Sequence, residues 1–174
     1  MVIVLLGILG TLGISFFAPM INLYFFTPTQ LRIEYTGNQT IKDMIEGNNT
    51  AKGLRIMKRV TSATTTAITY LDKNDISVTL TWDNVNLRIT RTVNAVTTVL
   101  PILSPQTDVK IDGIASGVIF KYYDSSNVLL ASPVVTPANI ARIQMDLVAY
   151  TGSGEIKAYQ GKYYIRTGVF LKQF

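Results

Sequence analysis

The chain has 174 residues and a net charge of +5, from 16 Lys and Arg against 11 Asp and Glu. It contains no Cys and no His, which excludes disulfides, thiolate nucleophiles, His-based catalytic triads and most transition-metal sites. The length is that of one domain with or without an appended anchor, and the modest basic excess does not by itself indicate a nucleic-acid partner.

Residues 1–26 form an apolar run, and the first charged residue of the chain is Arg32. As a helix this run would span roughly 39 Å, more than the ~30 Å hydrocarbon core of a bilayer. A cleaved signal peptide is a poorer match, because the basic n-region is missing and the run is too long. A buried core helix is the third alternative. We expect residues 1–26 to form a membrane helix.

Small residues mark one face of this expected helix. Gly7, Thr11 and Ser15 recur at i, i+4 and i+8, with Gly10 beside them. Because small residues let helices approach closely in lipid, these four are the candidate helix-packing residues. The alternative is a chance pattern in a helix that touches only lipid. Pro19 removes a backbone N–H group and predicts a helix kink.

Residues 27–62 are expected to continue the helix as an amphipathic segment with breaks. Thr27 and Pro28 fit the N-cap and the first position of a restarted helix. Apolar residues then recur at helical spacing as far as residue 60, while Gly37, Gly47 and Gly53 interrupt the pattern.

The remaining residues, 63–174, show a period of two. Apolar and polar side chains alternate in five runs, at 76–82, 87–93, 118–124, 141–150 and 163–174. Such alternation is typical of half-buried antiparallel strands, and the joints between runs are turn sequences such as DKND and DSSN. We therefore predict an α+β fold, in which a long hydrophobic and amphipathic N-terminal helix precedes an antiparallel β-sheet domain.

The apolar start and four later blocks, in this order, resemble the type IV pilin-like family. MVIVLLGILGTLGISFFAP is similar to the family's N-terminal helix, and LRIMKRVTSATTTAITY at 54–70 is similar to the helix end and first strand. VTLTWDNVNLRITRTVN resembles the following hairpin, and GVIFKYYDSSNVLL and IARIQMDLVAY resemble later strands. This combination is that of the larger minor pilins and pseudopilins, the J-type of type II secretion and the W-type of pili.

The resemblance implies a processed N-terminus. In that family a prepilin peptidase cuts after a Gly, and the mature chain begins with an N-methylated Phe followed by Thr-Leu-Ile-Glu. MVIVLLG fits the positions directly after that Glu, so the charged lead-in is expected upstream of Met1. The resemblance also implies an inner-membrane location with a periplasmic C-terminal domain, and later incorporation into a pilus or pseudopilus filament.

Two other groups of residues have structural interpretations. Asp72 with Asp75, and Asp124 with Asn127, supply oxygen atoms of the kind that bind Ca²⁺, but Asx-rich β-turns account for them better. The basic run KGLRIMKR at 52–59 lacks the interleaved aromatic residues that stack bases. We interpret it as a solvated face or subunit contact and expect no nucleic-acid partner. No catalytic, cofactor or metal site is predicted.

The sequence thus predicts a structural protein and no enzyme: a minor pilin or pseudopilin. Its expected partners are other pilin-like subunits, the inner membrane before assembly, and prepilin peptidase acting on the precursor. The alternative is an inner-membrane-anchored β-domain that binds a ligand such as a polysaccharide. An upstream Gly-Phe-Thr-x-x-Glu would decide for the pilin or pseudopilin, whereas a basic n-region would favour the membrane-anchored binding domain.

Overall fold

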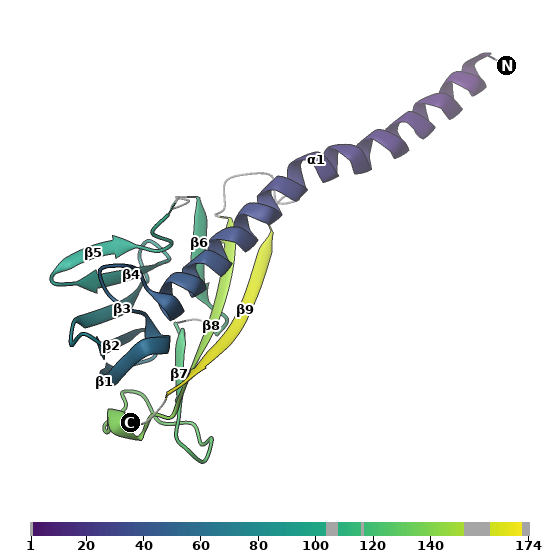
Figure 1. Ribbon diagram of the computed structural model, residues 1–174. Coiled ribbons are helices and arrows are strands. Elements are labelled where there is room, and N and C mark those ends of the chain that lie inside the picture. The colour runs from purple at the N-terminus through teal and green to yellow at the C-terminus, as the bar shows by residue number, and fades with distance from the viewer. Residues whose placement is uncertain (1, 104–107, 116, 152–160, 172–174) are drawn as a thin grey trace.

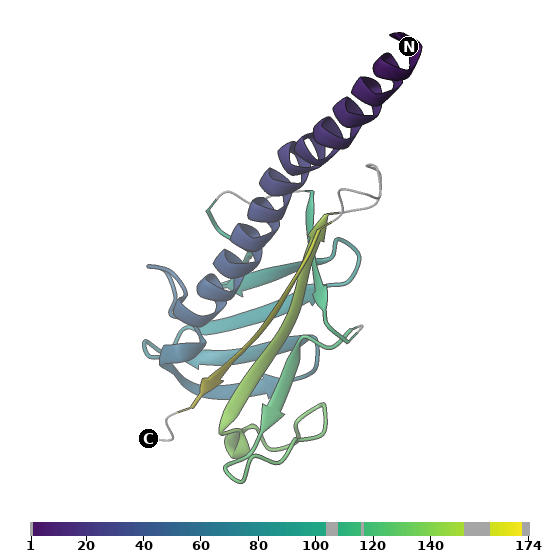
Figure 2. The same ribbon diagram turned by 90° about the vertical axis from the view of Figure 1, so that its right-hand side faces the viewer.

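A computed structural model describes residues 2–103, 108–115, 117–151 and 161–171. Within residues 2–26 it describes the side chains of Ser15, Phe17, Pro19, Met20 and Tyr24. The chain forms one long helix followed by antiparallel strands (Figure 1), which confirms the predicted α+β class. The end of the helix lies against the strands, and its N-terminal part projects away from them (Figure 2).

The helix α1 (Val2–Glu46) continues through Pro19 and Pro28 without interruption. The predicted restart at Thr27 and Pro28 is therefore wrong. A proline inside a helix removes one hydrogen bond to the residue four positions earlier, here Tyr24. Pro28 is exposed, and the helix tolerates the loss of this one bond at its surface.

The helix ends at Glu46 because Gly47 adopts a left-handed backbone with φ 75°, and its N–H donates to the Asp43 carbonyl at 3.0 Å. A short 3₁₀ turn η1 (Leu54–Ile56) and strand β1 (Met57–Ala63) follow. The prediction that helix continues with breaks through 62 is wrong for residues 47–62. Two register shifts in β1 spoil its alternation, so its apolar spacing imitates a helix.

The first sheet is a five-stranded meander with the order β1-β2-β3-β4-β5. Its further strands are β2 (Ala67–Asp72), β3 (Ser77–Asp83), β4 (Arg88–Val93) and β5 (Val96–Val99). The predicted runs 76–82 and 87–93 correspond to β3 and β4, and Val78, Leu80 and Ile89 are fully buried as their alternation predicts.

The second sheet is organised around its longest strand, β8 (Arg142–Thr151), and is formed with β6 (Val109–Gly113), β7 (Phe120–Tyr123) and β9 (Lys162–Phe170). β9 pairs along one edge of β8, while β7 and β6 pair with the first and last parts of its other edge. A 3₁₀ turn η2 (Pro137–Asn139) precedes β8. Runs 118–124, 141–150 and 163–174 correspond to β7, β8 and β9, with residues 172–174 outside the described residues.

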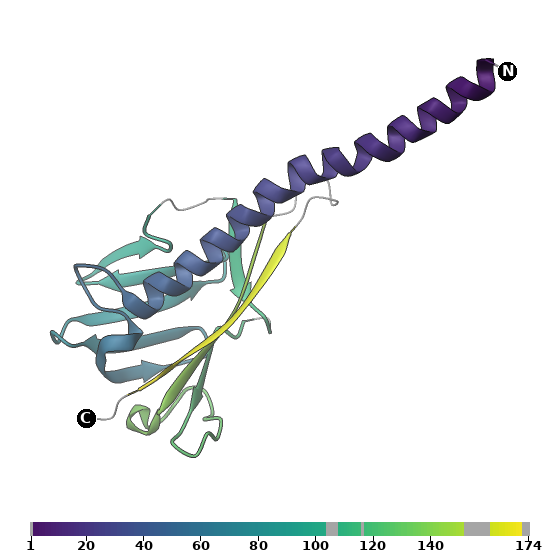
Figure 3. The same cartoon turned by 45° about the vertical axis from the view of Figure 1, so that its right-hand side comes forward.

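One hydrophobic core joins the helix and both sheets. The C-terminal half of α1 crosses the inner face of the second sheet (Figure 3), where it packs on β8 and β9. Gly37 lies in this contact, where a Cβ would be 2.6 Å from Ile165 Cδ1 and 3.3 Å from Ala149 Cβ and Tyr163 Cδ1. The two sheets are tied by the Trp82 indole N–H, which donates to the Ile111 carbonyl at 3.1 Å. The largest fully buried apolar side chains include Ile33, Met44, Leu54, Tyr70, Leu80, Ile111, Phe120 and Tyr122.

Candidate assembly surface on the N-terminal helix

The two faces of α1 differ sharply where the helix lies against the sheets. The inner face is buried and consists of residues with helical spacing: Ile33, Thr36, Gly37, Thr40, Ile41 and Met44. Leu31 and Tyr35 lie on the opposite face and are 61% and 52% exposed. The domain therefore covers one side of the helix and leaves apolar side chains on the other.

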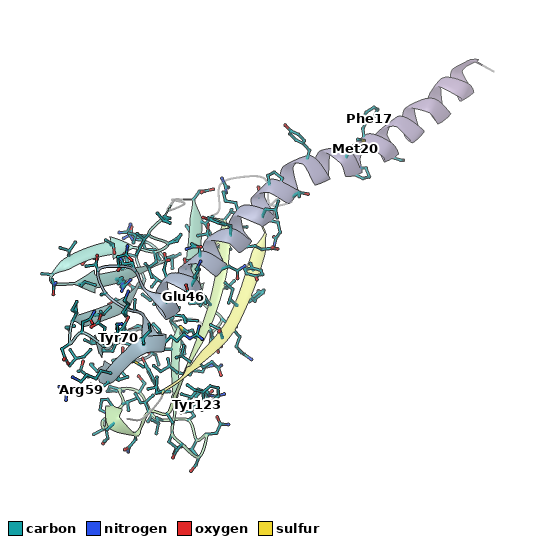
Figure 4. The ribbon with its side chains drawn as sticks, viewed as in Figure 1. Phe17, Met20, Glu46, Arg59, Tyr70 and Tyr123 are labelled. Atoms are coloured by element: carbon teal, nitrogen blue, oxygen red, sulfur yellow. The ribbon has the colours of Figure 1, made fainter. Side chains whose placement is uncertain are left out.

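The exposed apolar face continues along the projecting part of the helix. Phe17, Met20 and Tyr24 are 62%, 55% and 76% exposed, and Figure 4 shows Phe17 and Met20 on this projecting part. At 100° per residue, these positions and Leu31 and Tyr35 fall within a sector of about 60°. We call these five residues the apolar stripe.

The charge distribution leaves this helix segment neutral. No Asp, Glu, Lys or Arg precedes Arg32. The Arg32 guanidinium forms an ion pair with Asp108, at the start of β6. On the helix itself, Glu34 accepts a hydrogen bond from the Gln30 side chain at 2.9 Å. The sequence of α1 thus carries no charged side chain over about eight turns before Arg32.

Such a surface favours association with another apolar surface. Each stripe side chain is more than half exposed, and fully burying a Leu, Phe or Met side chain contributes about 1.5–3 kcal/mol. Contiguous exposed apolar patches on soluble proteins mark interaction sites. The spacing of three, four and seven residues between stripe members is that of helices packing side by side. The stripe is therefore suited to helix–helix packing.

The predicted helix-packing residues lie mostly outside the described side chains. Nothing is described of the side chains of Gly7, Gly10 and Thr11, whose packing role stays a prediction. Ser15 is exposed and lies on the side of the helix roughly opposite the apolar stripe. Pro19 is also exposed and the helix continues through it. In the part of the chain that the structure describes, no helix has the length and hydropathy needed to cross a membrane.

The Asx-rich segments form β-turns whose carboxylates bind backbone groups. Asp72 Oδ1 accepts N–H bonds from Asn74 at 2.7 Å and Ile76 at 3.0 Å, and its Oδ2 accepts from Lys52 at 3.0 Å. Asp124 Oδ1 accepts from two backbone N–H groups of its own turn, at 2.9 and 2.8 Å. Among the described residues, no cluster of three or more acidic side chains could hold a metal ion.

The basic run at 52–59 lies in η1 and β1, not on a helix. Arg55, Lys58 and Arg59 are exposed, and Lys58 pairs with Asp75 at 2.7 Å. The run borders a cleft of about 930 Å³ that both apolar and charged residues line. Its lining residues are Glu46, Leu54, Arg55, Ile56, Met57, Lys58, Lys73, Phe170 and Leu171.

The predicted helix-packing residues Gly7, Gly10, Thr11 and Ser15 include no member of the apolar stripe. A helix restart at Pro28 would break the angular relation between Tyr24 and Leu31, and that prediction hid the continuous face. The available signal was the seven-residue spacing from Tyr24 to Leu31, which keeps a helical face only if the helix is continuous.

Comparisons of this chain with protein-family models, with curated proteins and with solved structures found no match.

Proposed function

We propose that this protein is a structural subunit of a helical filament, a minor pilin or pseudopilin of a type IV pilus or a type II secretion system. The observation that carries the proposal is the apolar stripe on a helix that projects from a folded β-domain. The domain covers the inner face of α1 and leaves the stripe outside, so the stripe is available to a second helix. The sequence resemblance stated above points to the same class.

In this proposal the apolar N-terminal segment holds the subunit in the inner membrane before assembly, with the β-domain in the periplasm. Prepilin peptidase acts on the precursor, and other pilin-like subunits then replace lipid around the helix. Burial of the stripe against their helices stabilises the assembled state, since each buried apolar side chain contributes about 1.5–3 kcal/mol. The β-domain faces outward, and a place in a tip complex follows from the likeness to larger minor subunits.

The test replaces two apolar side chains of the stripe, Leu31 and Tyr35, by polar ones. Leu31→Gln with Tyr35→Gln introduces polar groups into a surface that we expect to be buried in the filament. Because both side chains are more than half exposed in the single chain, the folded domain should keep its stability. Incorporation into sheared filaments should fall at least about tenfold at unchanged cellular abundance.

The matched control is Val85→Gln with Val135→Gln. These side chains are 84% and 93% exposed and lie in loops of the β-domain, away from the helix. They should enter the sheared fraction like the wild type. If the stripe variant assembles as well as this control, helix packing through the stripe is wrong and the filament proposal loses its main support.

A further inference from the structure

The outer face of the second sheet, opposite the face that packs on α1, has an unusual composition. The pairing registers place every second residue of β8, from Arg142 to Tyr150, on this face together with the residues opposite them. We call this surface the outer face. It consists of Lys110, Asp112, Lys121, Tyr123, Arg142, Gln144, Asp146, Val148, Tyr150, Lys162, Tyr164, Arg166, Gly168 and Phe170.

The outer face is basic. It holds five Lys and Arg against two Asp, a net charge of +3, which is more than half of the chain's net charge of +5. Lys162 is exposed, and the Arg166 side chain is 63% exposed. A polyanion that lies along β8 and β9 would therefore meet a cation in three of the five rows, at Arg142, Arg166 and Lys162.

Four aromatic rings are interleaved with these cations. Phe170 and Tyr164 are 76% and 59% exposed, and Tyr123 and Tyr150 are half-buried. The Arg142 guanidinium lies 4.0 Å from the centre of the Tyr123 ring and 5.9 Å from that of Phe170. These three residues share one row across β7, β8 and β9 and form a platform of flat groups.

Two cations of the outer face, Lys121 and Arg166, bind one buried carboxylate. Asp146 is 1% exposed and accepts hydrogen bonds from Lys121 at 2.7 Å, Gln144 at 2.9 Å and Arg166 Nε at 2.9 Å. Burial would raise the pKa of Asp146, but these donors outweigh burial and lower it, so the carboxylate stays charged. Arg166 uses its Nε for this bond, and its side chain is still 63% exposed. Arg166 is thereby positioned to donate to an anion in solvent.

We propose that the outer face binds single-stranded nucleic acid. Proteins that bind single strands combine a positive surface along the backbone with aromatic side chains and Arg planes on which bases stack, and the outer face has both on one antiparallel sheet. Phe170 carries no polar atom, so its ring suits a base better than a sugar hydroxyl. The expectation of no nucleic-acid partner rested on the basic run at 52–59, which contains no aromatic residue in its sequence. In the fold this run borders a cleft that Phe170 also lines, so the ring of the outer face lies next to it.

This inference goes beyond assembly and does not depend on it. The test uses the full chain in detergent and a fluorescent oligothymidylate of about 15 nucleotides, within the site sizes of single binding faces. Fluorescence anisotropy should show binding that weakens steeply with salt. Phe170→Ala should lower the affinity at least about fivefold. Lys162→Gln should reduce the slope of log affinity against log salt by about 0.7.

The matched controls lie away from the outer face. Arg59→Gln removes the same charge as Lys162→Gln, from the exposed edge strand β1, and Val135→Ala removes an exposed apolar side chain from a loop. Both should bind like the wild type. Unchanged thermal unfolding of Phe170→Ala, whose side chain is 76% exposed, separates loss of binding from loss of fold.

Three results would overturn the proposal. The first is no binding at low salt. The second is equal affinity for a duplex of the same length with no effect of Phe170→Ala, which would leave only charge attraction without stacking. The third is tighter binding of a polyuronate than of the oligothymidylate, which would assign the outer face to acidic polysaccharide.

Discussion

The carboxylate of Asp72 is predicted to be a main structural contact of the β-domain. It is fully buried and accepts three backbone N–H bonds, two within the β2–β3 turn and one from Lys52 in the segment after α1. It therefore ties the end of the helix to the first sheet. Asp72→Asn keeps one oxygen acceptor but turns an amide N–H₂ group toward a backbone donor.

The loss of stability expected for Asp72→Asn follows from these contacts. A hydrogen bond to a charged group contributes about 1.5–3 kcal/mol, and Asp72→Asn loses one such bond, loses the charge from the others and leaves a buried donor unpaired. The free energy of unfolding should fall by about 3 kcal/mol, which corresponds to a drop in Tm of about 6–12 °C for a chain of this size. Urea and thermal unfolding monitored by circular dichroism measure both.

Asp75→Asn is the matched control. Asp75 belongs to the same turn, but its carboxylate is 60% exposed and, among the residues that the structure describes, its ion pair is with the exposed Lys58. Surface pairs of this kind contribute about 0–1 kcal/mol, so the control should remain close to the wild type. Equal stability of Asp72→Asn and Asp75→Asn would refute the structural role of Asp72. A rise in Tm on adding millimolar Ca²⁺ would instead support the calcium interpretation of this turn.

The pH dependence of the stability provides an independent check on the role of Asp72. Burial would raise the pKa of Asp72, but the backbone N–H bonds outweigh it and hold the pKa below its ordinary value. A carboxylate whose pKa is lower in the folded chain contributes stability above its unfolded pKa of about 4, and loses that contribution as the pH falls through the folded pKa. The difference in stability between the wild type and Asp72→Asn should therefore shrink between pH 5 and pH 2.

Two further substitutions test the packing of the helix and the core. Gly37→Val should lower the free energy of unfolding by about 1–3 kcal/mol, because the added side chain meets Ile165 and separates α1 from the second sheet; urea unfolding equal to that of the wild type would contradict this contact. Arg91 is 1% exposed, donates only to the Ala51 carbonyl among the described residues, and leaves Nε and Nη1 unpaired. Arg91→Met should raise the free energy of unfolding by about 1 kcal/mol, and a lower value would show that the guanidinium is better paired than its geometry indicates.

The alternation of side chains predicted most of the strands because those strands have one buried face. In β3, Val78 and Leu80 are buried and Ser77, Thr79 and Thr81 are not. In β8, Ile143, Met145 and Leu147 alternate with polar residues in the same way, although Asp146 on the other face is buried too. Alternation also assigns Arg91 to the same face of β4 as the buried Ile89, although charged side chains are normally exposed to solvent. A two-residue period records which face a residue belongs to and carries no information on what covers that face.

The errors arose where local signals competed with tertiary contacts. Thr27 and Pro28 have the composition of a helix start, but the helix passes through them because its inner face is anchored on the second sheet beyond them. Gly37 has the composition of an interruption, yet it lies within α1 at the contact with Ile165. Neither outcome can be derived without knowing which element packs against the helix.

The two candidate surfaces differ in how far the sequence could reveal them. The apolar stripe follows from helical spacing once α1 is known to be continuous. The outer face is assembled from β6, β7, β8 and β9, which lie far apart in the sequence, and only their registers bring Tyr123, Arg142 and Phe170 into one row. No short motif records that arrangement.

The most direct test of the proposed function is photo-crosslinking from single positions in cells that assemble the filament. Benzoylphenylalanine placed at Leu31 or Tyr24 should crosslink the chain to the helix of another pilin-like subunit, identified by mass spectrometry. The same group at Val135, 93% exposed on the β-domain, should give no helix crosslink. Crosslinks to a neighbouring helix from Val135, or none from the two stripe positions in intact filaments, would contradict assembly through the apolar stripe.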